Sequence, residues 1–228
     1  MNKNLLVVFA FLAICYAGCK NNAYSPPPPS PSNSYLPETV GSNWTYRDSI
    51  YGEPTDTVPI VGVRIDTMTY TMNGATTDFN GDICYNVDVV SKLNGHSTAY
   101  FHVDNHLNSL MESTVPYGLT DLQILIDTAS VGHTWTFSPT NNGVLNTNPV
   151  KGISTIVEKN ISKMVNGITY PNVIHTSINV QVNVNGAGFH NIANYDFYLA
   201  KGFGLIEKDA SFYGLLNETK TLLNYNVK

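Results

Sequence analysis

Apolar and polar residues alternate along much of this chain, and a period of two residues is typical of β-strands with one buried and one solvated face. In INVQVNVNG, residues 178–184 alternate Ile or Val with Asn or Gln, and the run ends at Asn185-Gly186. The Asn-Gly dipeptide is typical of tight β-hairpin turns. It occurs five more times, beginning at Asn73, Asn80, Asn94, Asn142 and Asn166. Six such turns between β-rich runs predict an antiparallel β-meander.

Two segments leave their local structure open. VPIVGVRIDTMTYTM, residues 58–72, fits one long strand or two strands joined at a bend near Gly62. Residues 122–127 are the one candidate for a helix, because Thr120 would cap it and Gln123 stands in the capping-box position. The LQILI run in this segment fits a buried strand equally well. The sequence therefore predicts an all-β fold with little helix.

The only two tryptophans of the chain stand in near-copies of one heptapeptide, VGSNWTY at 40–46 and VGHTWTF at 131–137. A second similarity follows each of them. NGDICYNV at 80–87 aligns without gaps on NGITYPNV at 166–173, with Asn, Gly, Asn and Val at the same offsets. Similar landmarks in the same order indicate an internal repeat.

A third similarity places Glu112 and Glu207 at equivalent positions, 68 and 72 residues after the tryptophan of each copy. We interpret residues 38–228 as a single β domain of two duplicated β-meander halves, about 38–115 and 120–228. A lone half would leave open sheet edges and an unburied face. Two halves side by side predict one antiparallel curved sheet or half-barrel, β-clam-like, around a shared core.

The N-terminus has the features of an export signal. It combines a positive charge at Lys3 with ten apolar residues at 5–14. Ten residues are too few to span a bilayer of about 30 Å as a helix, and they suit a signal peptide. Tyr16-Ala17-Gly18-Cys19 resembles the lipobox of bacterial lipoproteins, in which the Cys thiol receives a diacylglycerol. The resemblance implies a signal peptide at 1–18 and lipidation of Cys19. The alternative is an ordinary signal peptide cleaved nearby.

Residues 19–37 are predicted to form a proline-rich tether behind the lipidated Cys. Six of the twelve prolines lie between Pro26 and Pro37. Such a segment favours polyproline II and, at about 3.1 Å per residue, holds the folded part roughly 50 Å from the membrane. Lys20 stands where an inner-membrane retention signal has Asp, and no acidic run for surface export follows. The resemblance therefore implies an outer-membrane lipoprotein that faces the periplasm, with surface exposure left open.

Composition and cysteine content exclude some classes of protein. Charged residues are 13% of the chain and the net charge is −5, so the chain offers no basic face for nucleic acid. Cys15 leaves with the signal and Cys19 is lipidated, so the mature chain has no pair for an intramolecular disulfide. The remaining Cys84 is expected to be a small buried hydrophobe.

No motif for known chemistry stands out, since HExxH, GxSxG, P-loop and CxxC patterns are all absent. The DFNGD stretch at 78–82 is similar to a calcium loop, but Val89 stands where an EF-hand needs Glu. His102 and His106 flank a predicted turn, and two ligands do not complete a metal site. We therefore predict no metal site and no cofactor.

Carboxylates offer one further possibility. The equivalent positions of Glu112 and Glu207 could bring these side chains face to face, as acid–base catalysis requires. A shared structural role explains equivalent positions in a duplicated fold more simply. We therefore predict no catalytic residue, and a protein that is not an enzyme.

Three motifs carry a family resemblance: VGSNWTY behind the tether, NGITYPNVI, and YLAKGFGLIE near the C-terminus. They resemble those of a group of Bacteroidota lipoproteins of unknown function, with a G-x-x-W-x-Y strand after the anchor and a late A-K-G-x-G-L-I hairpin. The resemblance implies a β-clam like that of periplasmic lipoprotein carriers, with a concave apolar face. It implies no particular ligand.

Two functions fit these observations. The first is a non-enzymatic binding module, anchored to the membrane through Cys19, that holds an apolar or amphiphilic ligand or a partner protein of the envelope. The second is a structural or adhesive envelope lipoprotein that binds glycan or protein through its outer surface. The duplicated β architecture and the tether favour the first.

Overall fold

The computed structural model describes residues 33–52, 62–79, 82–104, 106–114 and 118–228. The predicted signal peptide, the lipidated Cys and the first part of the tether lie outside these residues. One Asn-Gly dipeptide, at the centre of the calcium-like DFNGD stretch, lies outside them too.

The described residues form a sheet of thirteen strands and one short 3-10 turn at Val184–Gly186, so the all-β prediction is confirmed. None of the helical structure among the described residues is long and apolar enough to cross a membrane. The strands are β1 (Asn43–Tyr51), β2 (Val63–Phe79), β3 (Asp82–Ser91), β4 (Gly95–Asp104), β5 (Leu107–Thr114), β6 (Gly118–Ile126), β7 (Thr134–Phe137), β8 (Val144–Leu145), β9 (Asn148–Val165), β10 (Ile168–Asn183), β11 (Phe189–Ala200), β12 (Gly204–Phe212) and β13 (Leu216–Asn226).

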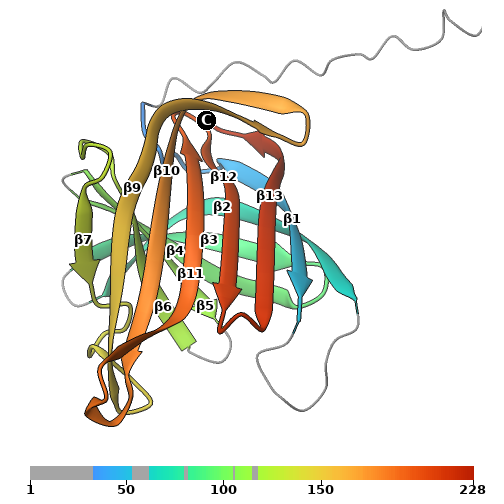
Figure 1. Ribbon diagram of the computed structural model, residues 1–228. Helices are drawn as coiled ribbons and strands as arrows, with labels where there is room; N and C mark the ends of the chain where they lie inside the picture. The colour runs from blue at the N-terminus through green and yellow to red at the C-terminus, as the bar shows by residue number, and fades with distance from the viewer. Residues whose placement is uncertain (1–32, 53–61, 80–81, 105, 115–117) are drawn as a thin grey trace, which may run out of the picture.

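Every pair of neighbouring strands is antiparallel, and the order across the sheet is β6-β5-β4-β3-β2-β1-β13-β12-β11-β10-β9-β7. The sheet bends back on itself at β1 and β13, so that β2 to β5 cross behind β9 to β13 (Figure 1). The result is a nearly closed, clam-like half-barrel with two facing layers and one interior, as predicted. We call β9 to β13 the front layer and β2 to β6 the back layer.

One end of the sheet, β6, meets β9 and the segment after β7 through scattered hydrogen bonds. The Asp121 N–H donates to the carbonyl of Pro139 at 3.0 Å, and Ser154 Oγ donates to the carbonyl of Gln123 at 2.7 Å. These contacts bring the back layer against the front layer at this edge.

The strand order fits the arrangement expected of two meanders. Trp44 lies in the first strand of one six-strand run, β1 to β6, and Trp135 in the first strand of the other, β7 and β9 to β13. Glu112 and Glu207 both lie in the fifth strand of their run. The duplication itself stays an interpretation of the sequence.

Most of the predicted turns are present. Asn166 and Gly167 have φ values of 50° and 80°, the left-handed pair that a type I′ hairpin requires, and they join β9 to β10. Turns also occur at the dipeptides beginning at Asn94, Asn142 and Asn185. The prediction fails at Asn73-Gly74, which lies inside β2, where the pairing with β3 shifts register. A bulge absorbs this dipeptide because the strand pairs on both sides of it.

The two open segments are strands. Residues 118–126 form β6, and Leu122, Ile124 and Leu125 are buried, so pairing with β5 and burial outweigh the weak capping signal. The long segment starts its strand at Val63, directly after Gly62, and its earlier residues lie outside the described part.

The folded part begins earlier than residue 38. Tyr35 and Leu36, assigned by sequence to the tether, are 7% and 1% exposed and belong to the core. The Gly202 N–H donates to the carbonyl of Ser34 at 2.9 Å. The end of the tether is therefore packed against the loop between β11 and β12, because its two apolar side chains are buried there.

Two of the sequence motifs that carry the resemblance contact each other in space. The indole N–H of Trp44 donates to the carbonyl of Phe203 at 2.7 Å, and Tyr46 Oη donates to the carbonyl of Leu205 at 2.9 Å. Pairing between β12 and β13 stops at Glu207, so these carbonyls lie beyond the paired stretch. A buried carbonyl without a partner is costly. The two aromatic side chains therefore complete the backbone hydrogen bonding of the G-L-I hairpin.

Replacing Trp44 with Phe should lower the free energy of unfolding by about 1–3 kcal/mol, because the change leaves the buried carbonyl of Phe203 without its donor. Urea denaturation of the full chain measures this cost. Trp135→Phe is the matched control: Trp135 is only partly buried, and its indole N–H has no hydrogen-bond partner among the described residues. Equal losses in the two variants would contradict the role of this hydrogen bond.

Candidate functional site

Charged side chains occupy inward positions in the middle of the sheet. In β12, Lys208 shares the inner face with Ile206 and Phe212, and in β13, Lys220 shares it with Leu222. Both lysines are 3% exposed. A buried ammonium group is tolerated only where carboxylates or other acceptors meet it. The inner face therefore requires acidic partners nearby.

The partners come from both layers. Lys208 Nζ lies 3.3 Å from Glu112 Oε2 in the back layer and 2.8 Å from Glu218 Oε1 in the front layer. Lys220 Nζ lies 3.4 Å from Glu112 Oε1 and 3.7 Å from Glu218 Oε1. Two ammonium groups and two carboxylates thus alternate across the interior, and Glu112 joins the back layer to both lysines of the front layer.

Tyr70 of β2 completes the link. Its hydroxyl donates to Glu112 Oε1 at 2.8 Å and accepts from Lys220 Nζ at 2.8 Å. Burial raises the pKa of Tyr70 far above its ordinary value, and Glu112 raises it further, so the phenol keeps its proton. We call Tyr70, Glu112, Lys208 and Lys220 the interlayer clamp.

The clamp is ionised. Burial alone would raise the pKa of Glu112, but the ammonium groups of Lys208 and Lys220 outweigh burial and hold that pKa well below its ordinary value. Burial alone would lower the pKa of each lysine, but Glu112 and Glu218 outweigh it and raise both values. Mutual attraction therefore keeps Glu112, Glu218, Lys208 and Lys220 charged inside the protein.

Asp48 is the fifth ionisable group. It lies on β1, is 6% exposed, and its Oδ1 has no hydrogen-bond partner among the described residues. Burial, and after it the charge of Glu218, raises the pKa of Asp48 to about 6, against the opposing effect of Lys220 and Lys208. Asp48 is thus the group in this cluster whose charge changes within a few pH units of neutrality.

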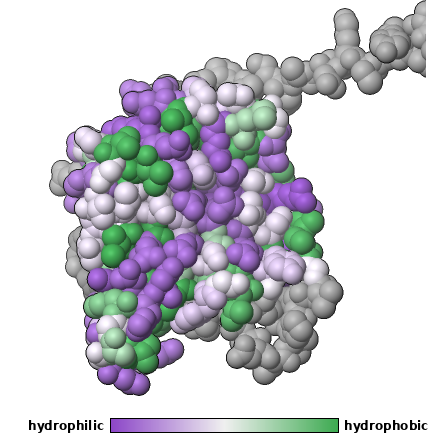
Figure 2. Space-filling view, viewed as in Figure 1, coloured by the Kyte–Doolittle hydropathy of each residue, from purple (hydrophilic) through white to green (hydrophobic). Residues whose placement is uncertain are grey.

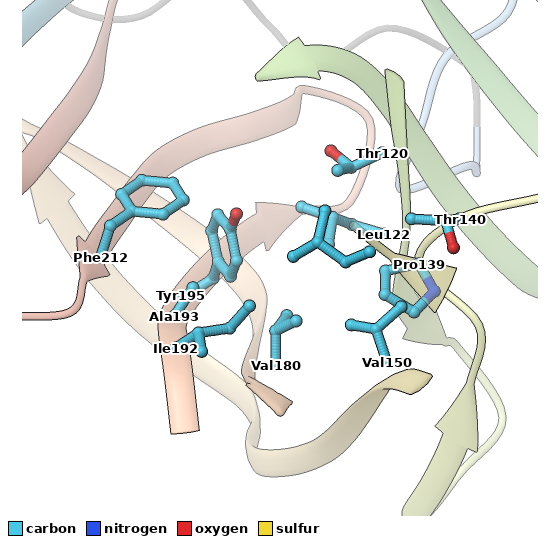
Figure 3. Close-up of a pocket in the computed structure, with 11 residues that line it drawn as sticks. Thr120, Leu122, Pro139, Thr140, Val150, Val180, Ile192, Ala193, Tyr195 and Phe212 are labelled. Atoms are coloured by element: carbon cyan, nitrogen blue, oxygen red, sulfur yellow. The ribbon is translucent and has the colours of Figure 1, made fainter. Parts of the chain in front are cut away.

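An apolar pocket lies between the two layers (Figure 3). Phe212 in its wall shares the inner face of β12 with Lys208 of the cluster. Leu122 of β6 faces residues of β9 to β12 across it, and its walls include Val150, Val180, Ile192, Tyr195 and Phe212. The cavity measures about 20 Å³, room for one water-sized group or a methyl group. The concave face is therefore not a continuous apolar groove, because the chain's own side chains, charged in the middle, fill most of it.

Residues 138–147, which we call the flap, cover one side of the pocket with Pro139, Thr140 and Leu145. The flap bonds mainly to itself and to the start of β9: Thr140 Oγ1 donates to the carbonyl of Val144 at 3.1 Å, and the Val150 N–H donates to the carbonyl of Gly143 at 2.9 Å. It is a small hydrogen-bonded unit between β7 and β9, and it contacts β6 through the Asp121–Pro139 hydrogen bond.

The two equivalent glutamates do not meet. Glu112 lies in the interior, whereas Glu207 pairs with Lys163 Nζ at 2.8 Å and sits next to Lys208 on β12, hence on the opposite face of the strand. The hypothesis that the two carboxylates face each other is therefore wrong, because the two strands place these aligned residues on different faces.

The other sequence candidates do not converge on a site. His106 pairs with Asp127 at 2.9 Å, and His102 lies on β4 near Glu38. Within the described ranges, no group of three or more His, Cys, Asp and Glu side chains is arranged to hold a metal ion. Cys84 is fully buried, as expected.

Asp48, Lys208, Glu218 and Lys220 were missed from the sequence. A signal for them exists, since charged residues stand at the apolar parity of strands in I-x-K-x-A-x-F and E-x-K-x-L. That signal shows which side chains face inward. It does not show which residues of the opposite layer they meet.

Comparison of the chain with protein-family models and with curated proteins finds no match. Two solved structures are similar in fold. One is described as a putative exported protein with a YmcC-like fold from Bacteroides fragilis, at 8% identity and a TM-score of 0.46, over 84% of this chain and 98% of that one. The other is described as a putative lipoprotein from Parabacteroides distasonis, at 11% identity and a TM-score of 0.49, over 86% of this chain and 99% of that one.

Replacing Glu112 with Gln should lower the free energy of unfolding by about 3–5 kcal/mol, because it removes the one carboxylate that contacts both buried lysines from the back layer. Chemical denaturation at neutral pH measures the loss.

Glu207→Gln is the matched control for this variant, because the proposed repeat aligns Glu207 with Glu112, whereas Glu207 makes a single ion pair on the outer face. We expect it to cost about 1 kcal/mol or less. Similar losses in both variants would show that the clamp contributes no more than a surface pair.

Proposed function

We propose that this chain is a lipid-anchored envelope protein that binds an apolar or amphiphilic ligand without chemical conversion. The observation that carries the proposal is the apolar pocket between the layers, which is lined from five strands and the flap. Apolar pockets with a few polar groups, including those at the mouths of β-barrels, are common ligand sites.

The size of the cavity limits what enters it. About 20 Å³ accommodates the end of a hydrocarbon chain, and the interlayer clamp occupies the space beyond. A ligand that inserts further displaces the flap, which holds to β6 through the Asp121–Pro139 hydrogen bond. The ligand is therefore held by one apolar end, with its remaining part outside the sheet.

The membrane anchor and the cellular location that we propose are inferred from the sequence. Cys19 carries the lipid, the proline-rich tether separates the domain from the bilayer, and the outer membrane facing the periplasm is the compartment that the signal residues favour. In this arrangement the binding domain samples a volume close to the membrane, where amphiphiles are concentrated.

A partner protein or glycan on the outer surface is the second candidate. Tyr51, Val63 and Ile65, on adjacent strands β1 and β2, are 50–59% exposed, and Tyr213 and Leu215 are exposed at the β12–β13 hairpin. On the face shown in Figure 2, by contrast, polar residues divide the apolar ones into small patches. The exposed residues near the end of β1 are the observation that favours this candidate.

Val180→Ile should weaken binding of a fluorescent fatty acid, cis-parinaric acid, by at least fivefold, because the added methylene fills most of the cavity. Fluorescence titration of the full chain in detergent at a fixed concentration measures the affinity. Val157→Ile, on a β9 position that is 39% exposed, adds the same group outside the pocket and should leave the affinity unchanged.

Equal affinity of all three proteins for the probe would place any binding elsewhere, and absence of binding to the wild type would contradict the aliphatic ligand class. Native mass spectrometry of the protein purified from its own host's envelope then separates the candidates. A small amphiphile released on denaturation supports the pocket, whereas a bare mass together with a crosslinked envelope protein supports the outer surface.

A further inference from the structure

Asp48 and Lys220 stand directly opposite each other on neighbouring strands β1 and β13, both facing the interior. Such a pair on adjacent strands is normally within reach of a salt bridge. Lys220 Nζ instead lies 2.8 Å from Tyr70 Oη and 3.4 Å from Glu112 Oε1. The lysine thus reaches across the interior, and Asp48 Oδ1 is left without a hydrogen-bond partner among the described residues.

The charge count of the cluster explains why this arrangement is unstable when every carboxyl is ionised. Three carboxylates, those of Asp48, Glu112 and Glu218, share the ammonium groups of Lys208 and Lys220. Lys208 is already 2.8 Å from Glu218 and 3.3 Å from Glu112. An ionised Asp48 can therefore be paired only by taking Lys220 from the clamp.

We propose that proton binding at Asp48 controls the interlayer clamp. With the proton bound, Lys220 stays on Tyr70 and Glu112 and joins the front layer to the back layer. Once the proton leaves, Asp48 draws Lys220 toward β1, and the back layer loses one of its two ammonium contacts.

The other groups around Asp48 leave Lys220 as its one available partner. Glu218 of β13 lies near Asp48 and repels its charge. Lys208 of β12 is also near, but it is already paired with Glu218 and Glu112. On β2, Asp66 stands opposite Asp48, and the Asp66 carboxylate already accepts hydrogen bonds from Ser91 Oγ and the Lys92 N–H. Tyr46 of β1 donates its hydroxyl to the carbonyl of Leu205.

The sign of the pH dependence follows from the raised pKa of Asp48, about 6 against an ordinary value of 3.8. The folded protein holds this proton more tightly than the unfolded chain, so stability from Asp48 is lost as the pH rises through the range from about 4 to 6. The lowered pKa values of Glu112 and Glu218 act oppositely, since their contribution is lost as the pH falls below about 4.5. Comparison with a variant that lacks only the Asp48 carboxyl isolates the first effect.

The test is hydrogen–deuterium exchange of the full chain between pH 5 and pH 8, corrected for intrinsic exchange, in wild type and Asp48→Asn. In the wild type, protection of β2 and β5 should fall about tenfold over this range, more than that of β9 and β10. The Asn variant, which cannot ionise, should change by less than twofold. Asp209→Asn, a carboxyl paired with Thr219 outside the cluster, is the control and should behave like the wild type.

Identical profiles for wild type and Asp48→Asn would overturn the proposal. An equal loss of protection in every strand would overturn the clamp mechanism, because Asp48 would then act only on global stability. Carboxyl ¹³C titration of the wild type gives a measurement that needs no variant: a midpoint for Asp48 near 6 agrees with the proposal, and a midpoint near 4 contradicts it.

Discussion

Two lysines buried between β-layers are tolerated only because carboxylates reach them, and one of these comes from the facing layer. Glu112 stands on β5 and both lysines on the last two strands, so the first half of the chain neutralises charges of the second. Breaking such a contact leaves an uncompensated charge in the interior, which costs more than an intact buried pair contributes. The clamp therefore contributes less to net stability than to fixing the position of one layer relative to the other. Any relative shift of the layers that separated Glu112 from Lys208 and Lys220 would bury unpaired charges.

The same cluster decides what the interior can bind. An apolar concave face, implied by the resemblance to lipoprotein carriers, would require apolar side chains along the whole inner surface. Ile206 and Phe212 satisfy this on β12, but Lys208 stands between them. The interlayer clamp thus restricts the apolar space to the end of the interior that Leu122, Val180 and Phe212 line. An elongated apolar ligand is consequently limited to the edge of the sheet.

The fold followed from the sequence more closely than the site did. The two-residue period and the Asn-Gly turns predicted the antiparallel meander, because both are local signals. They failed at Asn73-Gly74, where pairing on either side keeps the strand continuous, and at Leu36, whose burial depends on the distant loop around Gly202. The clamp was beyond these signals for the same reason. The alternation of residues along β12 shows that Lys208 faces inward. Its partners Glu112 and Glu218 are 96 and 10 residues away along the chain, and only the bending of the sheet brings them to it.

The two tryptophans and the two glutamates, which the proposed repeat aligns, take different roles in the structure. Trp44 is central and donates to the Phe203 carbonyl, whereas Trp135 lies on the short edge strand β7. Side chains alternate between faces along a strand, so a difference of one residue in register exchanges the inner and outer sets. On β12 the alternation puts Glu207 outside and its neighbour Lys208 inside, where Lys208 meets Glu112, which the proposed repeat aligns with Glu207. Glu112 and Glu207, which the proposed repeat aligns, therefore lie on opposite faces of the sheet, and it is Lys208 that meets Glu112 in the interior, where a second carboxylate would repel it.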